Sequence, residues 1–355
     1  MNWPSHGSNP QYIYEAMNIP KPKTLIDLSA NINPLGPPSV VKEKWAEFYN
    51  KIGDYPDPYA TSLRKTIAQK EVLPIESVLI GNGGSELISL LGRMFSGKHV
   101  LIIQPTFTEY EKASLVNGCK VEYHHLNEGW ELELDSLIGK LAHTDALFLC
   151  NPNNPTGICF PYDTILRLAD ACKQKDCYLV VDEAFYDFWK DYVSLTPILR
   201  DYNNVILLRS LTKMFAIPGL RLGYLLANQS VLEKLTPYQP HWSVNILAML
   251  AGEECVRSDV FIKQTVKYIE KERQNLFDHF QQEGFMVSPS NINFYLLRDS
   301  ESTEQLQLFE FLLRHGIVPR HTMNFPGLEG QWMRFAIKST KENQRLLEVL
   351  KEWRQ

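Results

Sequence analysis

The sequence has no apolar run of about 18 residues, the length that a membrane-spanning helix needs. Its N-terminus, MNWPSHGSNP, is polar and lacks the hydrophobic core of a signal peptide. The six cysteines are scattered without a CxxC pair, so we expect neither a disulfide framework nor a zinc site, and we predict no metal site. These absences predict a cytoplasmic protein that has no membrane partner.

A long basic run is also absent, and the formal net charge is −5, which argues against nucleic acid as a partner. No internal repeat or low-complexity tract is visible. What is present is a chain of 355 residues, 44% hydrophobic and 22% charged, which is the ordinary range of globular proteins. A chain of this length can bury a large core and is long enough for two domains.

Short apolar runs alternate with helix-length segments from about residue 78 onward. The predicted strands are Val78–Ile80, Val100–Ile103, Lys120–His124, Ala146–Leu149, Tyr178–Val181, Val205–Leu208 and Gly223–Leu226. Such an alternation predicts an α/β fold, in which a mostly parallel mixed sheet is covered by helices on both faces. In a sheet of this kind the ligand lies at the carboxyl ends of the strands.

The pattern differs at the two ends of the chain. Residues 1–40 are rich in Pro and Asn and predict an extended arm, whereas residues 41–240 contain the predicted large domain. Beyond residue 240 we expect a smaller α+β domain, residues 241–355, built from a long helical segment (Val244 to Glu283), two strands (Asn293–Leu297, Trp332–Ala336) and two helices (Glu304–His315, Lys341–Trp353). The polar arm has no core of its own, so we expect it to pack with the small domain at the entrance to the site.

Lys213 follows the predicted strand Val205–Leu208, with Ser210 three residues before it and Arg221 eight residues after it. A lysine just past a buried strand can lose solvation, which lowers its pKa and makes it a competent amine nucleophile. Ser210 and Arg221 supply a hydroxyl and a guanidinium, the groups that bind a phosphate. A lone lysine is more often a solvated surface residue. This pattern nevertheless suggests pyridoxal phosphate held as a Schiff base.

Two further motifs follow predicted strands and offer groups to such a cofactor. The segment IGNGGSEL places Gly84 and Ser85 before a helix, where backbone N–H groups can approach a phosphate. A simple βα turn with Ser85 as the N-cap of the helix is the alternative interpretation of this segment. The segment PTFTEY brings Tyr110, which can stack on a heteroaromatic ring or serve as a core tyrosine.

Two more strand ends carry polar groups. The segment NPNNPTG offers the amide of Asn154 to a ring oxygen, and a structural turn alone would not need all of these residues. Asp182 ends a buried strand, where a carboxylate is costly unless it is paired. A pyridinium N–H is a suitable partner that keeps the ring an electron sink, and a salt bridge to another side chain is the alternative.

Taken together, these motifs resemble the fold-type I pyridoxal-phosphate enzymes of the aspartate aminotransferase superfamily, over nearly the whole chain. The resemblance implies that Lys213 forms the Schiff base, that Asp182 faces the pyridine nitrogen, that Asn154 binds the phenolic oxygen and that Tyr110 stacks on the ring. It also implies that Gly84, Ser85, Ser210 and Arg221 hold the phosphate, that Arg334 binds a substrate carboxylate, and that Tyr55 reaches the phosphate of a neighbouring subunit in a homodimer with shared active sites.

One position departs from the aminotransferase pattern. Phe185 stands three residues after the aspartate, where these enzymes usually carry a tyrosine that binds the phenolic oxygen. The start of the chain, with HGSN (6–9) and LSANINPLGPP (28–38), and the segment GIVPRHTMNFPGL (316–328) resemble the L-threonine-O-3-phosphate decarboxylases of cobalamin biosynthesis, kin of the histidinol-phosphate aminotransferases. The decarboxylases tend to carry DEAF, which fits Phe185.

This resemblance implies a phosphorylated amino acid as substrate, with one carboxylate and one phosphate to bind. The candidate substrate residues are His6, Asn33, Asn154, Arg320, His321 and Arg334. Taken alone, His6 is equally explained as part of a disordered arm and Arg320 as a solvated loop cation. We expect decarboxylation to (R)-1-aminopropan-2-yl phosphate, with a histidinol-phosphate or related aminotransferase as the alternative. A protein of this fold that only binds would need a DNA-binding module or loss of the lysine, and neither is seen.

Overall fold

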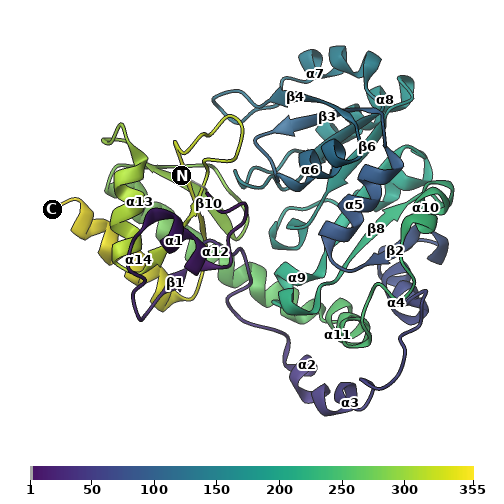
Figure 1. Cartoon of the computed structure of the whole chain (residues 1–355), viewed down its shortest axis with the longest axis horizontal. Coiled ribbons are helices and arrows are strands. Elements are labelled where there is room, and N and C mark those ends of the chain that lie inside the picture. The colour runs from purple at the N-terminus through teal and green to yellow at the C-terminus, as the bar shows by residue number, and fades with distance from the viewer. Residues whose placement is uncertain (1–2) are drawn as a thin grey trace.

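A seven-stranded sheet forms the centre of the larger domain of the computed structural model, which describes residues 3–355 (Figure 1). The strand order is β2-β8-β7-β6-β5-β3-β4, and β8 runs antiparallel to both of its neighbours. The strands are β2 (Val78–Gly81), β3 (His99–Gln104), β4 (Lys120–His125), β5 (Ala146–Cys150), β6 (Tyr178–Asp182), β7 (Val205–Ser210) and β8 (Gly223–Ala227). The prediction of a mostly parallel mixed sheet is confirmed, and each predicted strand matches within two residues at either end.

Helices cover both faces of this sheet, because side chains of successive strand residues point to opposite faces. Leu101, Leu147 and Val181 belong to a core shared with α4 (Thr61–Glu71), α8 (Tyr162–Gln174) and α11 (Ile246–Val256). Their neighbours Ile102, Phe148 and Val180 belong to a second core, shared with α5 (Gly84–Met94), α6 (Glu109–Val116) and α10 (Gln229–Leu235). Buried on both faces, the strands are nearly continuous apolar runs, as a parallel sheet requires.

The smaller domain contains a four-stranded antiparallel sheet in the order β12-β13-β10-β9. Its strands are β9 (Phe285–Val287), β10 (Phe294–Asp299), β12 (Arg320–His321) and β13 (Met333–Ala336), and α12 (Asp259–Gln282), α13 (Gln305–Arg314) and α14 (Thr340–Trp353) accompany them. The last helix begins with a capping box, in which Ser339 and Glu342 each bind the other's backbone N–H.

The N-terminal arm lies on the smaller domain, at the left of Figure 1. It contains α1 (Pro10–Met17) and β1 (Ile26–Asp27), and β1 pairs in parallel with β11 (Ile317–Val318). The Tyr14 hydroxyl also donates to the carbonyl oxygen of Leu313 at 2.7 Å. The chain then crosses to the larger domain through α2 (Ser39–Glu43) and α3 (Trp45–Tyr49), which protrude below it.

The long helical segment expected from Val244 to Glu283 consists of two helices, α11 and α12, which are separated at Arg257 and Ser258. The first of them, α11, packs against α4, α2 and α3. The domain boundary at residue 240 stays a prediction. Within residues 3–355, none of the helices combines the length and apolar character that crossing a membrane requires.

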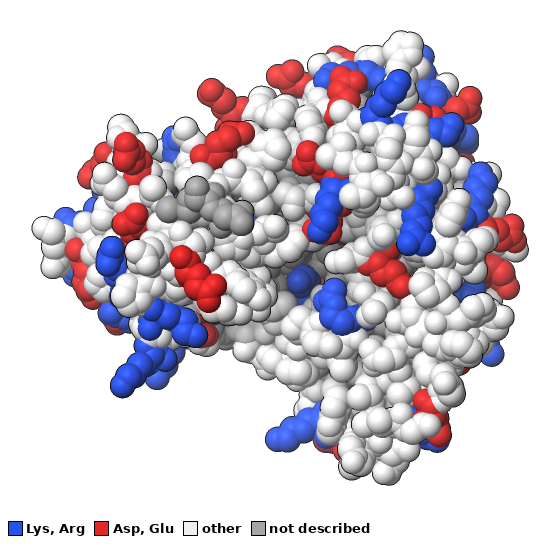
Figure 2. Space-filling model, viewed as in Figure 1, with Lys and Arg blue, Asp and Glu red and all other residues white. Residues whose placement is uncertain are grey.

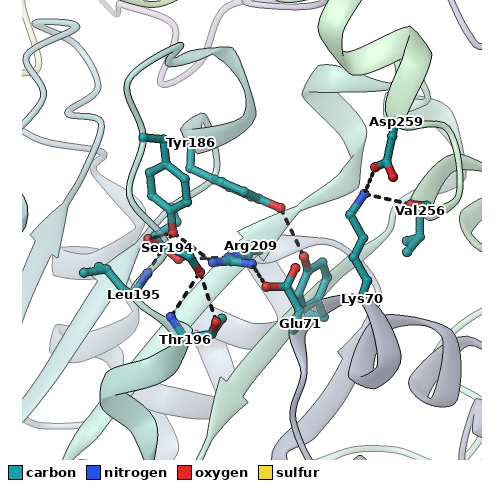
Figure 3. A network of polar contacts seen from close by, with 12 residues as sticks. Lys70, Glu71, Tyr186, Ser194, Leu195, Thr196, Arg209, Val256 and Asp259 are labelled. Atoms are coloured by element: carbon teal, nitrogen blue, oxygen red, sulfur yellow. Dashed lines mark hydrogen bonds and ion pairs between the residues drawn. The ribbon is translucent and has the colours of Figure 1, made fainter.

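Arg209 is the centre of a buried polar network on the face of the sheet that α4 covers (Figure 3). Its guanidinium, 1% exposed, forms ion pairs with Glu71 at 2.7 Å and Glu183 at 2.8 Å. The ring of Tyr186 lies 4.1 Å from the guanidinium carbon, and the hydroxyl of Tyr192 accepts a hydrogen bond from it. The network ties β6, β7 and α4 together, because its charged members come from or directly follow these elements.

Candidate active site

The carboxyl ends of the central strands open into a cavity of about 240 Å³ between the two domains. Figure 2 shows this face of the molecule hollowed between the domains, with basic side chains inside the hollow. Most of the predicted site residues line the cavity, and three, Tyr55, Asn33 and His321, do not.

One end of the cavity is formed by the turn before α5. Gly83 has φ +79°, and a Cβ at this position would lie 2.7 Å from Nη2 of Arg221, so a larger residue would displace the guanidinium. Gly84 and Ser85 begin α5 and line the cavity, where the first N–H groups of the helix are free to bind an anion. Arg221 itself holds φ +60°, a strained conformation for a residue with a side chain.

Two hydroxyl groups complete this end of the cavity. Ser210 ends β7 and its Oγ lies 2.8 Å from Oγ1 of Thr212; both residues line the cavity. Ser210 was predicted as a phosphate ligand, whereas Thr212 was missed, although it directly precedes the lysine in the sequence SLTK. The loop glycines, the helix start, two hydroxyls and one guanidinium form an anion site of the size of a phosphate.

Lys213 lies in the short helix α9 (Leu211–Met214) and faces the same cavity. Its pKa is lowered to about 8, chiefly by burial and also by the positive charges of Arg334 and Arg221, while Asp182 acts in the opposite direction. About a tenth of the amine is therefore unprotonated at pH 7, the form that a nucleophilic lysine requires.

Asp182 ends β6 and is buried, with 4% of its surface exposed. Its Oδ1 accepts a hydrogen bond from the backbone N–H of Ala184 at 2.9 Å, and its Oδ2 accepts one from the hydroxyl of Tyr110 at 2.5 Å. Burial raises the pKa of Asp182 to about 6. No cation pairs directly with this carboxylate within residues 3–355, so lone pairs remain for a cationic partner in the cavity.

These groups fit pyridoxal phosphate. An anion cradle stands at one end, a buried carboxylate without a paired cation faces the cavity, and an amine of lowered pKa lies between them. The cofactor would present a phosphate to the first, a pyridinium to the second and an aldehyde to the third.

Arg334, on β13 of the smaller domain, reaches into the cavity beside Asn154. Its Nη1 donates to Oδ1 of Asn154, and its Nη2 donates to the carbonyl oxygen of Ser29 at 2.7 Å, whereas its Nε has no partner in the described chain. Burial and the nearby charge of Arg320 lower the pKa of Arg334 to about 9. A bound carboxylate or phosphate would relieve both effects.

Arg320 lies at the outer end of the cavity and holds the N-terminal arm. It is 3% exposed, and its Nη2 donates to the carbonyl oxygen of Ser5 at 2.7 Å and to Oδ1 of Asn324 at 2.8 Å. Burial lowers its pKa to about 10. The guanidinium therefore meets carbonyl and amide oxygens, but no carboxylate that would neutralise it.

His321 does not line the cavity, and its binding of substrate stays a prediction. Its Nε2 lies 2.9 Å from the carbonyl oxygen of Pro4 and 2.5 Å from Nη1 of Arg320, and its ring packs 4.7 Å from that of Trp3. Burial lowers the pKa of His321 to about 3, with Arg320 adding to the effect, so the imidazole is neutral. The imidazole thus contacts the arm and the guanidinium of Arg320, and it is Arg320 that lines the cavity.

Asn33, which was also predicted as a substrate residue, does not line the cavity, and its binding of substrate stays a prediction. Its side-chain amide donates to the carbonyl oxygen of Met214 at 2.7 Å and to Oγ1 of Thr265 at 2.9 Å, and its backbone N–H donates to the carbonyl oxygen of Lys213 at 3.1 Å. Asn33 thus supports the backbone of the lysine. Asn31 lines the cavity instead, and its Oδ1 has no partner among residues 3–355. This irregular segment has no periodicity that indicates which asparagine points inward.

His6 is the predicted arm residue that does reach the cavity. Its Nε2 lies 2.9 Å from Oε1 of Glu109, which begins α6 of the larger domain, and its ring lies 5.9 Å from that of Phe107. The arm is therefore bound to the smaller domain through Arg320 and to the larger domain through His6. It covers part of the entrance to the cavity.

Phe185 lines the cavity and packs edge-on against Phe294, with ring centroids 4.8 Å apart. The neighbouring Tyr186 points away toward Arg209, as expected, so it does not replace the missing hydroxyl. Phe107 also lines the cavity and was missed, although it lies in the PTFTEY segment. Stacking of Tyr110 on the cofactor ring stays a prediction, and its bond to Asp182 was not foreseen.

Comparison with known proteins gives one consistent result. The family model described as aminotransferase class I and II matches residues 23–350. Threonine-phosphate decarboxylase of Salmonella typhimurium is 36% identical over 351 residues, 98% of this chain and 96% of the relative. The crystal structure of histidinol-phosphate aminotransferase from Clostridium acetobutylicum has a TM-score of 0.88 at 32% identity and covers 93% of this chain and 99% of its own. The crystal structure of L-threonine-O-3-phosphate decarboxylase from Porphyromonas gingivalis has a TM-score of 0.82 at 26% identity. It covers 92% of this chain and 98% of its own.

The contact between Gly83 and Arg221 predicts the result of Gly83→Ala. The new methyl group displaces the guanidinium from the phosphate end, and loss of one charge-assisted hydrogen bond, about 1.5–3 kcal/mol, should weaken pyridoxal phosphate binding roughly ten- to a hundred-fold. Gly97→Ala is the matched control, because Gly97 also has a positive φ, +73°, but nothing lies within 4 Å of its Cβ position. Equal cofactor affinity of the two variants, measured by titration of the apo-protein, would contradict the assignment.

The lowered pKa of Lys213 predicts how covalent attachment of pyridoxal phosphate to the apo-protein depends on pH. Only the unprotonated amine reacts, so the attachment rate should rise with pH up to about 8 and then level off. The rate is measured by stopping the reaction with borohydride and quantifying the labelled peptide, which should be unlabelled in Lys213→Ala. A rate that continues to rise beyond pH 10, or labelling of another lysine, speaks against Lys213.

Proposed function

Since the chain belongs to the class I and II aminotransferase family, and is therefore an enzyme that uses pyridoxal phosphate, we propose that it decarboxylates L-threonine O-3-phosphate to (R)-1-aminopropan-2-yl phosphate. This reaction is a step of cobalamin biosynthesis. The proposal is supported by the 36% identity to a threonine-phosphate decarboxylase over nearly the full length of both chains.

The observation that carries the proposal is the pair of buried guanidinium groups, Arg320 and Arg334, at the substrate end of the cavity. Both have lowered pKa values because burial is not compensated by a directly paired carboxylate. Two buried cations favour a ligand with two anionic groups, and an amino acid phosphorylated on its side chain carries a carboxylate and a phosphate. Asn31 adds an unpartnered amide oxygen to the same region, which suits the substrate's ammonium or hydroxyl donors.

Phe185 favours decarboxylation over transamination. A tyrosine at this place would offer a hydroxyl to the cofactor's phenolic oxygen, whereas here an apolar ring, held by Phe294, occupies the cavity wall. Asn154 is then the chain's remaining side-chain donor for that oxygen, and its amide orientation is fixed by Arg334, which binds its Oδ1.

When bound, pyridoxal phosphate supplies an electron sink for a bond to Cα of the substrate. Arg320 and Arg334 would grip the substrate phosphate and thereby orient the substrate so that its carboxylate, and not the hydrogen on Cα, is the group that leaves. Lys213, whose lowered pKa is suited to this role, or a water would then deliver a proton to Cα. The arm, held by Arg320 and His6, limits the access of water to this region.

A histidinol-phosphate or related aminotransferase is the second candidate. The structure from Clostridium acetobutylicum is more similar to this chain, at 32% identity, than that of the decarboxylase from Porphyromonas gingivalis, at 26%. Such an enzyme would use the same cofactor groups and would bind the carboxylate of its second substrate, the 2-oxo acid, at Arg334.

We also propose a homodimer in which Tyr55 completes the partner's site. Tyr55 is 83% exposed and lies outside the cavity of its own chain, with its ring 5.3 Å from that of the exposed Trp242. Large exposed aromatic side chains of this kind indicate a surface that another protein covers. Tyr49 and Tyr59, also exposed, extend the same surface.

The reaction is tested by incubating the holoenzyme with L-threonine O-3-phosphate in the absence of any 2-oxo acid. We expect carbon dioxide and aminopropanyl phosphate in equal amounts. Arg320→Gln should lower kcat/KM roughly ten- to a hundred-fold, the effect of one charge-assisted hydrogen bond. Arg298→Gln is the control, since this small-domain arginine contacts Met286 and Trp332 away from the cavity. Stoichiometric keto product with 2-oxoglutarate, and no gas, would reverse the assignment.

The shared site is tested by mixing two inactive variants, Tyr55→Ala and Lys213→Ala. If Tyr55 acts across the dimer, each mixed dimer contains one intact site, and activity returns after the subunits exchange. If Tyr55 acts within its own chain, both sites of the mixed dimer lack a residue and activity stays absent. The molar mass measured by light scattering should be twice the 40.9 kDa of one chain, and the mass of a monomer would contradict the proposal.

A further inference from the structure

The Asp182 carboxylate is held from two sides by the chain itself. Tyr110, on α6, donates its hydroxyl to Oδ2 at 2.5 Å, and the backbone N–H of Ala184 donates to Oδ1 at 2.9 Å. The ring of Tyr110 is fixed by packing, stacked on Phe148 with centroids 5.4 Å apart and an interplanar angle of 25°. With 1% of its surface exposed, Tyr110 has little freedom to turn away from the carboxylate.

The direction of this hydrogen bond follows from the protonation states. Burial and the charge of Asp182 raise the pKa of Tyr110 well above its ordinary value of 10, so its oxygen carries a proton and donates it. The carboxylate accepts, and each of its oxygens keeps a further lone pair. Two donors at fixed positions therefore determine how the carboxylate is turned within the cavity wall.

Several neighbours act on the charge of Asp182. Its pKa is raised to about 6, because burial and the carboxylate of Glu183 raise it more than Tyr110, the Ala184 N–H and the charge of Lys213 lower it. Cys150 lies opposite Asp182 on β5, and burial raises the pKa of this thiol to about 12, so it brings no charge. The hydroxyl of Tyr110 is thus among the few groups that keep this buried carboxyl ionised near neutral pH.

We propose that Tyr110 is a positioning residue that acts through Asp182, because its hydroxyl holds the carboxylate ionised and turns its free lone pairs toward the ring nitrogen of pyridoxal phosphate. Tyr110 thereby contributes to cofactor affinity and to the charge of the ring by its hydrogen bond, whether or not its ring face touches the cofactor. This role of Tyr110 requires that the protein binds pyridoxal phosphate, but it does not depend on which substrate bond is broken. It can therefore be tested independently of the decarboxylase assignment.

The test is Tyr110→Phe, which keeps the ring and its packing and removes only the hydroxyl. We expect the Kd of the apo-protein for pyridoxal phosphate to rise about ten-fold, the equivalent of about 1.4 kcal/mol. Removing a donor raises the pKa of Asp182, so cofactor binding should weaken at a higher pH as the solution is acidified. A ten-fold effect on the ionisation of Asp182 corresponds to a shift of about one pH unit in the midpoint of this pH dependence.

Tyr123→Phe is the matched control. The Tyr123 hydroxyl also donates to a carboxylate at 2.5 Å, that of Glu111 on the same helix as Tyr110, but Tyr123 does not line the cavity. Its loss should leave the Kd for pyridoxal phosphate and its pH dependence unchanged. Equal effects in the two variants would overturn the proposal, because they would show that any lost tyrosine–carboxylate bond disturbs this domain.

Tyr110→His gives a second readout, since an imidazole N–H restores a donor in a ring of smaller size. Its Kd and pH profile should lie closer to those of the unmodified protein than those of Tyr110→Phe. The proposal is overturned if Tyr110→Phe binds the cofactor as tightly as the unmodified protein, or if Tyr110→His is as impaired as Tyr110→Phe. Thermal unfolding of each apo-protein accompanies the titrations, and a binding defect that only follows a general loss of stability also counts against the proposal.

Discussion

The register between β6 and β7 is the constraint on which both faces of the central sheet depend. Asp182 and Ser210 point to the cavity, and the residues next to them, Glu183 and Arg209, point to the opposite face and form a buried ion pair at 2.8 Å. A shift of one residue would exchange these faces and place the guanidinium in the cofactor cavity. Because a broken buried pair leaves an uncompensated charge, the ion pair opposes such a shift strongly.

The cavity itself has an excess of positive charge that its own chain does not neutralise. Arg334 and Arg221 both lower the pKa of Lys213, and Arg320 lowers that of Arg334. Anionic ligands would relieve this repulsion, and we propose that the cofactor phosphate binds beside Arg221 and the substrate anions beside Arg320 and Arg334. Binding of substrate should therefore raise the basicity of Lys213 at the stage where it must hold and deliver a proton.

The sequence predicts the regular parts of this molecule better than the irregular ones. Buried parallel strands are continuous apolar runs, so their ends were located within two residues, and with them Ser210, Lys213 and Asp182. Asn33 and His321 are positioned by a few long-range hydrogen bonds and not by a period, so the sequence alone does not show that both lie off the cavity wall. The break between α11 and α12 at Ser258 was not located, since the polar residues at the break fit a helix equally well.

The position of the N-terminal arm is difficult to predict from the amino-acid sequence. Ahead of α1, the arm contacts the smaller domain in part through the backbone carbonyl oxygens of Pro4 and Ser5, which any residue would supply. Their partners include the side chains of Arg320 and His321, which are more than 300 residues away in the sequence. Because the backbone fixes the position of the arm, the side chain of His6 is free to project toward Glu109 and the cavity. The outer part of the cavity is thus lined in part by a segment with no core of its own, whereas its inner part rests on the strand ends of the central sheet.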